Sequence, residues 1–157
     1  MPTVVEFASS DWVDEQVKMA ATAGADVVLV LGLDHPSRVE RAVRAARTHC
    51  VGIVLAMPSH VEPDVWCSMV EDAGVDGISL IRNIDSAESI GLTTTRIREV
   101  DSTISVPLII SGGFGPHNIN EVIDDDWSVV IVGGAFINSR DPASVLASMR
   151  ETLGLGQ

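Results

Sequence analysis

The sequence predicts an α/β fold in which about six βα units form most of a (β/α) TIM-type barrel. Short apolar runs rich in β-branched residues recur along the chain, and their starting positions lie 23, 25, 25, 30 and 22 residues apart. This spacing is typical of strands joined by helices of about a dozen residues. The last two runs end in Gly-Gly, as in the phosphate-binding loops of barrels. The expected strands are 4–7, 27–31, 52–57, 77–80, 107–110 and 129–132.

Helical patterns fill the intervals between these runs. Apolar residues recur there at three- and four-residue spacing. Gly24 and Gly74 each stand where a helix ends and a strand begins. Asp34 and Asp141 precede prolines expected in a first helical turn, which predicts that they are caps. The expected helices are 14–23, 36–48, 63–73, 88–100, 118–125 and 142–153.

The chain of 157 residues is expected to form a single incomplete barrel domain, 1–157. A complete eight-unit barrel takes about 250 residues. Six units are also compatible with an open doubly wound sheet, but the regular spacing and the glycine pairs favour the barrel.

The composition excludes several classes of partner. The net charge is −12, which repels nucleic acid and anionic membrane surfaces, so neither is expected to bind. No apolar run approaches the ~18 residues needed to span a bilayer, and no signal peptide is recognisable. We therefore expect a cytoplasmic protein. The same charge opposes a phosphorylated ligand, so a phosphate site needs strong local donors.

The glycine pairs predict such donors at one place. Gly112-Gly113 and Gly133-Gly134-Ala135 follow consecutive strands, 21 residues apart. Glycine lets bare backbone approach a ligand, and the exposed N–H groups then bind an anion. These residues are therefore the candidate binding site for a phosphorylated small molecule. The alternative is that the glycines only permit tight turns.

Four stretches, 23–32, 74–85, 106–113 and 130–143, resemble the 3-hexulose-6-phosphate synthase and 3-keto-L-gulonate-6-phosphate decarboxylase group. That group lies within the orotidine-monophosphate-decarboxylase-like barrels. The resemblance covers nearly the whole chain and begins at the family's third strand, which implies that two βα units, about 60 residues, are absent. It implies a ribulose-phosphate-binding barrel, a carbon–carbon lyase reaction, and a ketose phosphate such as ribulose 5-phosphate.

The family's Asp-x-Lys-x-x-Asp motif corresponds here to the segment from Glu6 to Asp11, with Ala8 in place of the lysine. The resemblance implies that Glu6 is a catalytic residue and a ligand of Mg²⁺. It implies that Asp11 is catalytic and reaches toward a neighbouring subunit's site. The family's next acidic position appears as Leu55, and of a later His-Arg pair only Arg82 remains as a third catalytic candidate.

Each of these residues also has a simpler interpretation. Glu6 is then a surface acid, Asp11 a helix cap, and Arg82 the partner of Asp85. Three functions therefore stay open. The chain is a working lyase or aldolase, a catalytically inactive phospholigand-binding or complex-forming subunit, or a divergent enzyme of the same superfamily. Ala8 favours the second and third, because alanine donates no proton.

A parallel sheet of six strands leaves two edges, at 4–7 and 129–132, and both are apolar. Open apolar edges pair with other chains. We therefore expect a homo-oligomer or a partner chain that completes the barrel, and a monomer at micromolar concentration would contradict this expectation.

Overall fold

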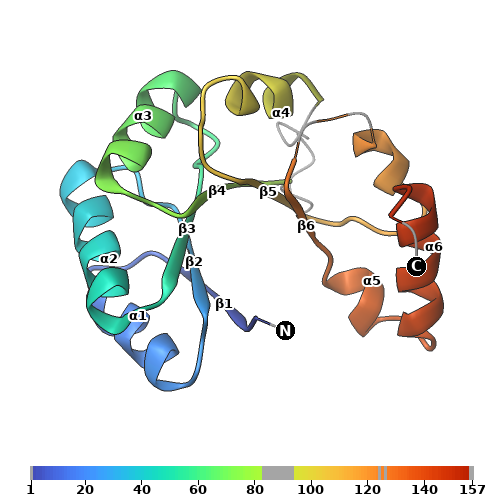
Figure 1. Ribbon diagram of the computed structural model, residues 1–157, viewed down its shortest axis with the longest axis horizontal. Helices are drawn as coiled ribbons and strands as arrows, with labels where there is room; N and C mark the ends of the chain where they lie inside the picture. The colour runs from blue at the N-terminus through green and yellow to red at the C-terminus, as the bar shows by residue number, and fades with distance from the viewer. Residues whose placement is uncertain (1, 83–93, 124, 126, 156–157) are drawn as a thin grey trace.

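The computed structural model describes residues 2–82, 94–123, 125 and 127–155, and its centre is one parallel six-stranded sheet. The strands follow one another across the sheet in chain order, and every neighbouring pair is parallel. The sheet curls, and the helices lie along its convex side (Figure 1). This order excludes a doubly wound sheet, whose strand order reverses, and confirms the predicted partial barrel. The strands are β1 (Val4–Ala8), β2 (Val27–Leu31), β3 (Gly52–Ala56), β4 (Gly77–Ile81), β5 (Leu108–Ser111) and β6 (Val129–Ile131).

The helices agree with the predictions at the start of the chain and depart from them toward its end. The predicted helix 118–125 is wrong, since only a single 3₁₀ turn forms there, in a stretch of weak helix formers. A short helix after β6 was not predicted. Positions 88–93 of another predicted helix lie outside the described residues. The helices are α1 (Val13–Thr22), α2 (Pro36–His49), α3 (Pro63–Ala73), α4 (Thr94–Asp101), η1 (Ile119–Val122), α5 (Gly134–Ile137) and α6 (Pro142–Thr152).

None of the helices in the described ranges is long and apolar enough to cross a membrane.

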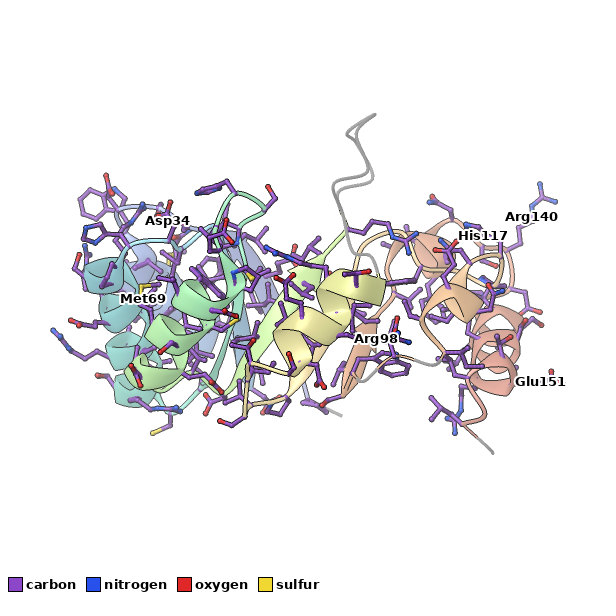
Figure 2. The ribbon with its side chains drawn as sticks, turned by 90° about the horizontal axis from the view of Figure 1, so that it is seen from above. Asp34, Met69, Arg98, His117, Arg140 and Glu151 are labelled. Atoms are coloured by element: carbon purple, nitrogen blue, oxygen red, sulfur yellow. The ribbon has the colours of Figure 1, made fainter. Side chains whose placement is uncertain are left out.

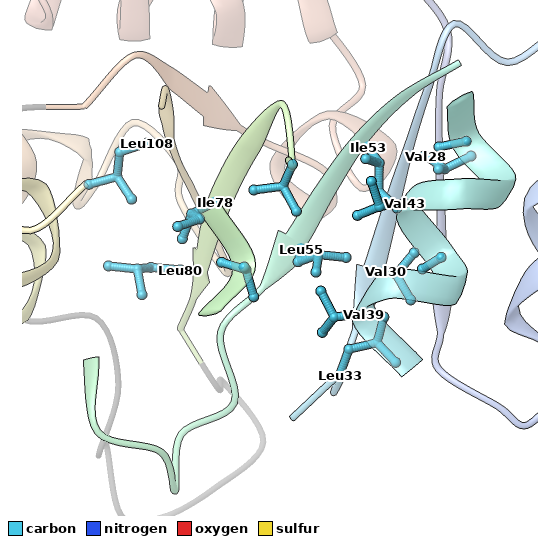
Figure 3. Close-up of a cluster of buried hydrophobic side chains, with 14 of the residues drawn as sticks. Val28, Val30, Leu33, Val39, Val43, Ile53, Leu55, Ile78, Leu80 and Leu108 are labelled. Atoms are coloured by element: carbon cyan, nitrogen blue, oxygen red, sulfur yellow. The ribbon is translucent and has the colours of Figure 1, made fainter. Parts of the chain in front are cut away.

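The two faces of the sheet carry different apolar clusters, because alternate strand residues point to opposite sides. On the convex face, Val28, Ile53 and Ile78 pack with Val39 and neighbouring residues under the helices (Figure 3). The concave face, which is the interior of a barrel, carries a smaller cluster centred on Leu29, Val54, Ala56 and Ile109.

Leu55 belongs to the convex cluster and is fully buried. Its side chain therefore does not face the barrel interior, where the resemblance would require a functional acid. The last interior-facing residue of β3 is Ala56, so the strand offers no carboxylate at this level.

A repeated acidic residue fixes where neighbouring strands begin. Asp26 Oδ2 accepts a hydrogen bond from the Thr3 N–H at 2.7 Å, and Asp76 Oδ2 accepts one from the Ile53 N–H at 2.8 Å. Each carboxylate follows a glycine in the left-handed region, Gly24 at φ +90° and Gly74 at φ +88°. The predicted helix ends at these glycines are confirmed, and each acid sets the register of the strand beside it.

The two predicted caps have different outcomes. Asp141 accepts hydrogen bonds from the Ser144 N–H and hydroxyl at the start of α6, which lowers the pKa of its carboxyl. That prediction is confirmed. The cap at Asp34 is wrong, because His35 occupies the N-cap position of α2 and the Asp34 carboxylate instead lies 3.3 Å from His60 Nε2.

The two thiols are expected to differ in reactivity. Cys50 is exposed, whereas burial, with smaller contributions from Glu71 and Asp64, raises the pKa of Cys67 to about 11. The thiolate is the reactive species, so at pH 8 iodoacetamide should label Cys50 alone, and Cys67 only after denaturation. Since the pKa of Cys67 is raised, its protonated form favours the fold below pH 9.0 and this contribution is lost as the pH rises through about 11. Peptide mass spectrometry checks the labelling, and equal rates for both thiols would contradict the burial.

Candidate functional site

The two glycine loops meet at the carboxyl edge of β5 and β6. Ser111 and Ile131 are register partners, so the following residues leave the sheet next to each other. A Cβ built on Gly115 would lie 3.3 Å from the Cβ of Ala135. The structure therefore places loop 112–115 against loop 133–135, which is the arrangement that a shared anion site requires.

Glycine is needed in the two loops for different reasons. Gly112 has φ +102°, and a Cβ there would overlap the Arg82 backbone, 2.7 Å from its nitrogen and in collision with its carbonyl oxygen. The fold itself therefore requires this glycine. Gly133 has φ −111°, a conformation open to any residue, and a Cβ there would have no heavy atom within 4 Å. At Gly134 the nearest atom would be Asn138 Nδ2 at 3.8 Å.

The packing thus explains Gly112 but not Gly133 or Gly134. The turn-only interpretation of the glycines accounts for the first loop and leaves the second without a structural reason. The space in front of Gly133 and Gly134 is open, and the first N–H groups of a helical turn have no acceptor within that turn. Bare backbone N–H donors facing open space are suited to bind an anion.

Asn118 braces the first loop, a role that the sequence did not indicate. Its Oδ1 accepts a hydrogen bond from the Gly115 N–H at 2.9 Å, and its Nδ2 donates to the Gly113 carbonyl at 3.1 Å. The residue is 9% exposed. Asparagine side chains bond readily to backbone a few residues away, so an Asn close behind a glycine loop is the signal that could have identified it.

Arg82 lies directly beside the first loop. Its N–H donates to the Ser111 carbonyl at 2.9 Å, and its guanidinium carbon lies 4.8 Å from the ring centre of Phe114. Nη2 donates to Glu121 Oε2 at 2.9 Å. The side chain is 20% exposed, and its buried Nε has no hydrogen-bond partner among the described residues.

The guanidinium therefore stands at the glycine edge with donor capacity to spare. The expected alternative partner, Asp85, lies outside the described residues. Glu121, which sequence reasoning missed, is the carboxylate that Arg82 meets here, and an incoming anion would compete with it.

The other two catalytic candidates lie at the opposite edge of the sheet. Glu6 is exposed on β1, in register with Leu29, and so faces the barrel interior. Asp11 pairs with Arg38 at 3.5 Å, and its carboxylate is 93% exposed. The N-cap of α1 is Trp12, so the interpretation of Asp11 as a helix cap is wrong.

These candidates do not form one constellation. Strands β2 and β3 separate β1 from β4, and within the described ranges no hydrogen bond or ion pair joins Glu6, Asp11 and Arg82. Mg²⁺ needs several oxygen ligands at once. In the part of the chain that the structure describes, no three His, Cys, Asp or Glu residues gather closely enough to hold a metal ion, so the residues around Glu6 do not fit the ion.

The histidines of the carboxyl-end loops divide between the two halves of the molecule. His60 contacts Asp34 beyond β2 and β3, whereas His117 lies on the half that carries the glycine loops. Figure 2 shows Asp34 and His117 on the same side of the molecule but toward opposite ends. Of these two histidines, His117 is therefore the one near the candidate anion site.

A curled parallel sheet in chain order, with outer helices and a glycine-lined carboxyl edge on its last two strands, defines a partial barrel of the ribulose-phosphate-binding kind. No protein-family model matches the chain. Its sequence relatives include several 3-hexulose-6-phosphate synthases. Synthase 2 of Staphylococcus saprophyticus is 26% identical over 142 residues, which are 90% of this chain and 67% of the relative. The Staphylococcus epidermidis enzyme is 26% identical over 144 residues, which are 91% of this chain and 69% of that enzyme.

Solved structures agree on the fold. The 3-hexulose-6-phosphate synthase of Salmonella typhimurium superposes with a TM-score of 0.83 and 21% identity, over 99% of this chain and 74% of the enzyme. A 3-keto-L-gulonate-6-phosphate decarboxylase from Vibrio cholerae gives 0.79 and 20%, over 97% of this chain and 72% of the enzyme. A KGPDC from Streptococcus mutans, solved in complex with a D-pentose phosphate, gives 0.79 and 13%, over 98% and 72%. The chain therefore has the fold of about three-quarters of such a barrel.

Proposed function

We propose that this protein binds a ketose phosphate, such as ribulose 5-phosphate, through its phosphate group at the meeting glycine loops. The observation that carries the proposal is the open space at Gly133 and Gly134, where the fold would accept a side chain and none is present. The names of the sequence relatives and the sugar-phosphate complex of one structural neighbour support the choice of ligand.

The phosphate would be held mainly by backbone. The N–H groups of Gly133, Gly134 and Ala135 would donate to it from one side, and the loop at Gly112 and Gly113 would approach from the other. These donors are neutral, which spares the site a large desolvation cost. Arg82 supplies the nearby positive charge that offsets the net charge of −12.

Catalysis is a separate question from binding. The names of the relatives favour a carbon–carbon lyase as a second candidate function. The residues favour binding without the family's reaction. Ala8 has no proton to donate, and in the described ranges Glu6 has no companion acids for Mg²⁺. We therefore propose a phosphosugar-binding protein in which Arg82 orients the ligand and the motif around Glu6 does not carry the chemistry.

Calorimetric titration with ribulose 5-phosphate, with inorganic phosphate as the control ligand, tests this function. We expect the sugar phosphate to bind at least about tenfold more tightly than phosphate, equally with and without Mg²⁺. Gly133→Asp should abolish binding, because its carboxylate enters the open space and repels the ligand. Its stability should stay close to that of the wild type, since nothing crowds that position.

A formaldehyde-condensation assay separates the two candidate functions. Binding without turnover would support the binding protein. Turnover that depends on Mg²⁺ and is lost in Glu6→Gln would overturn it in favour of the lyase. Binding no tighter than that of phosphate would reject both.

A further inference from the structure

The strands at the two ends of the sheet have unpaired backbone edges. β1 and β6 are the terminal strands, and each pairs on one side only. In β1 the direction of the free groups follows from the ladder. The Val27 N–H donates to the Thr3 carbonyl, and the Ser9 N–H donates to the Leu31 carbonyl. Odd-numbered residues therefore face β2, and the N–H and C=O groups of Val4, Glu6 and Ala8 point to the open edge.

Neither edge carries the features that usually prevent pairing. Protective edges use lysine, proline, bulges or covering segments. β1 reads Val-Val-Glu-Phe-Ala and β6 reads Val-Val-Ile, with Glu6 as the single charge between them. Val4 is 51% exposed on one edge and Val129 is 46% exposed on the other. Both edges are therefore suited to accept a further strand.

The size of the gap follows from the comparisons. Essentially all of this chain superposes on the Salmonella typhimurium barrel with a TM-score of 0.83, yet it covers 74% of that enzyme, close to six units of eight. The 144 matched residues are 69% of the Staphylococcus epidermidis enzyme, so about 65 of its residues lie outside the match. At about 30 residues for each of eight units, that length is two βα units.

We propose that β1 and β6 together form a docking surface for a polypeptide of two βα units, whose two parallel strands close an eight-stranded barrel. A second copy of this chain fits less well, because it would bring six strands and their outer helices to a gap of two strands. Both edge strands run in the same direction around the curl, so the occupant needs parallel strands joined by a helical crossover. Closure concerns backbone edges and needs no ligand, so it can fail or succeed independently of the proposed function.

The test adds such a polypeptide to the 157-residue chain. The probes are the parts of the Staphylococcus epidermidis and Staphylococcus saprophyticus synthases that lie outside the match, each co-expressed with this chain. Light scattering should show one probe bound to one 16.6 kDa chain. Hydrogen exchange at the amides of Val4, Glu6 and Ala8 should slow by about tenfold or more in the complex, because free edge amides become paired.

One variant distinguishes strand pairing from other contacts. Val4→Pro removes an outward N–H and leaves the β1–β2 ladder intact, so it should lose the probe, whereas Val4→Ala should keep it. Slow exchange at Ile53 and Leu55 would show that the proline variant is folded. The proposal is overturned if neither probe binds, or if the proline and alanine variants bind alike. It is also overturned if the same amides become protected in assemblies of 16.6 kDa multiples alone, which would assign the edges to a second copy.

Discussion

Gly112→Ala is expected to lower the free energy of unfolding by about 3 kcal/mol or more, whereas Gly133→Ala should lower it by less than about 1 kcal/mol. At Gly112 an alanine would adopt a left-handed backbone, which costs roughly 1–2 kcal/mol. Its Cβ would also collide with the Arg82 backbone, and overpacking adds roughly 1–3 kcal/mol. At Gly133 the backbone is ordinary and the space is empty. Urea denaturation of the two variants measures the difference.

The same pair of variants separates fold from function. Gly133→Ala should fold normally but weaken binding of ribulose 5-phosphate by about tenfold, because the methyl group enters the space proposed for the phosphate. Equal losses of stability in the two variants would contradict the structural distinction. A stable Gly133→Ala protein that binds the ligand as the wild type does would show that this space is not the phosphate site.

Arg82→Gln is expected to weaken binding of ribulose 5-phosphate by about 30-fold. A hydrogen bond to a charged group contributes roughly 1.5–3 kcal/mol, and about 1.4 kcal/mol is a factor of ten. Glutamine keeps an amide donor near Phe114 but loses the charge. Glu121→Gln should have the opposite effect and strengthen binding several-fold, because it removes the carboxylate that now occupies the guanidinium. Calorimetry at two salt concentrations measures both changes.

Arg41→Gln is the matched control for this charge change. Arg41 pairs with Asp14 on the first helices, at the other end of the sheet. It loses the same unit of charge, so any effect of the global field appears there as well. If Arg41→Gln weakens binding as much as Arg82→Gln does, Arg82 has no local role at the site.

The strands could be predicted because each is a buried apolar run with a turn at its end. β2 matches its predicted bounds, and the others differ by one residue at one or both ends. Helix α5 could not be predicted, since Gly134–Ile137 is too short to show an apolar period. Position 55 was assigned to the wrong face of its strand, because a continuous apolar run such as Ile53 to Leu55 does not reveal which residues face the helices.

The site was predictable only as far as local patterns reach. Two Gly-Gly pairs on consecutive strands indicated where donors gather, since strand order alone brings those ends together. The partner of Arg82 could not be predicted, because Glu121 lies 39 residues away in the chain and meets it only after folding. The different roles of Gly112 and Gly133 were equally hidden, because they depend on what each absent Cβ would touch.

The most direct test of the central claim is an amide-resolved titration by ¹H–¹⁵N NMR with ribulose 5-phosphate. The account predicts saturable shifts centred on Gly112, Gly113, Gly133, Gly134 and Ala135, and much smaller shifts with the same concentration of inorganic phosphate. Saturable shifts centred instead on the loops of Asp34 and His60, or no shifts at the glycine amides, would contradict it.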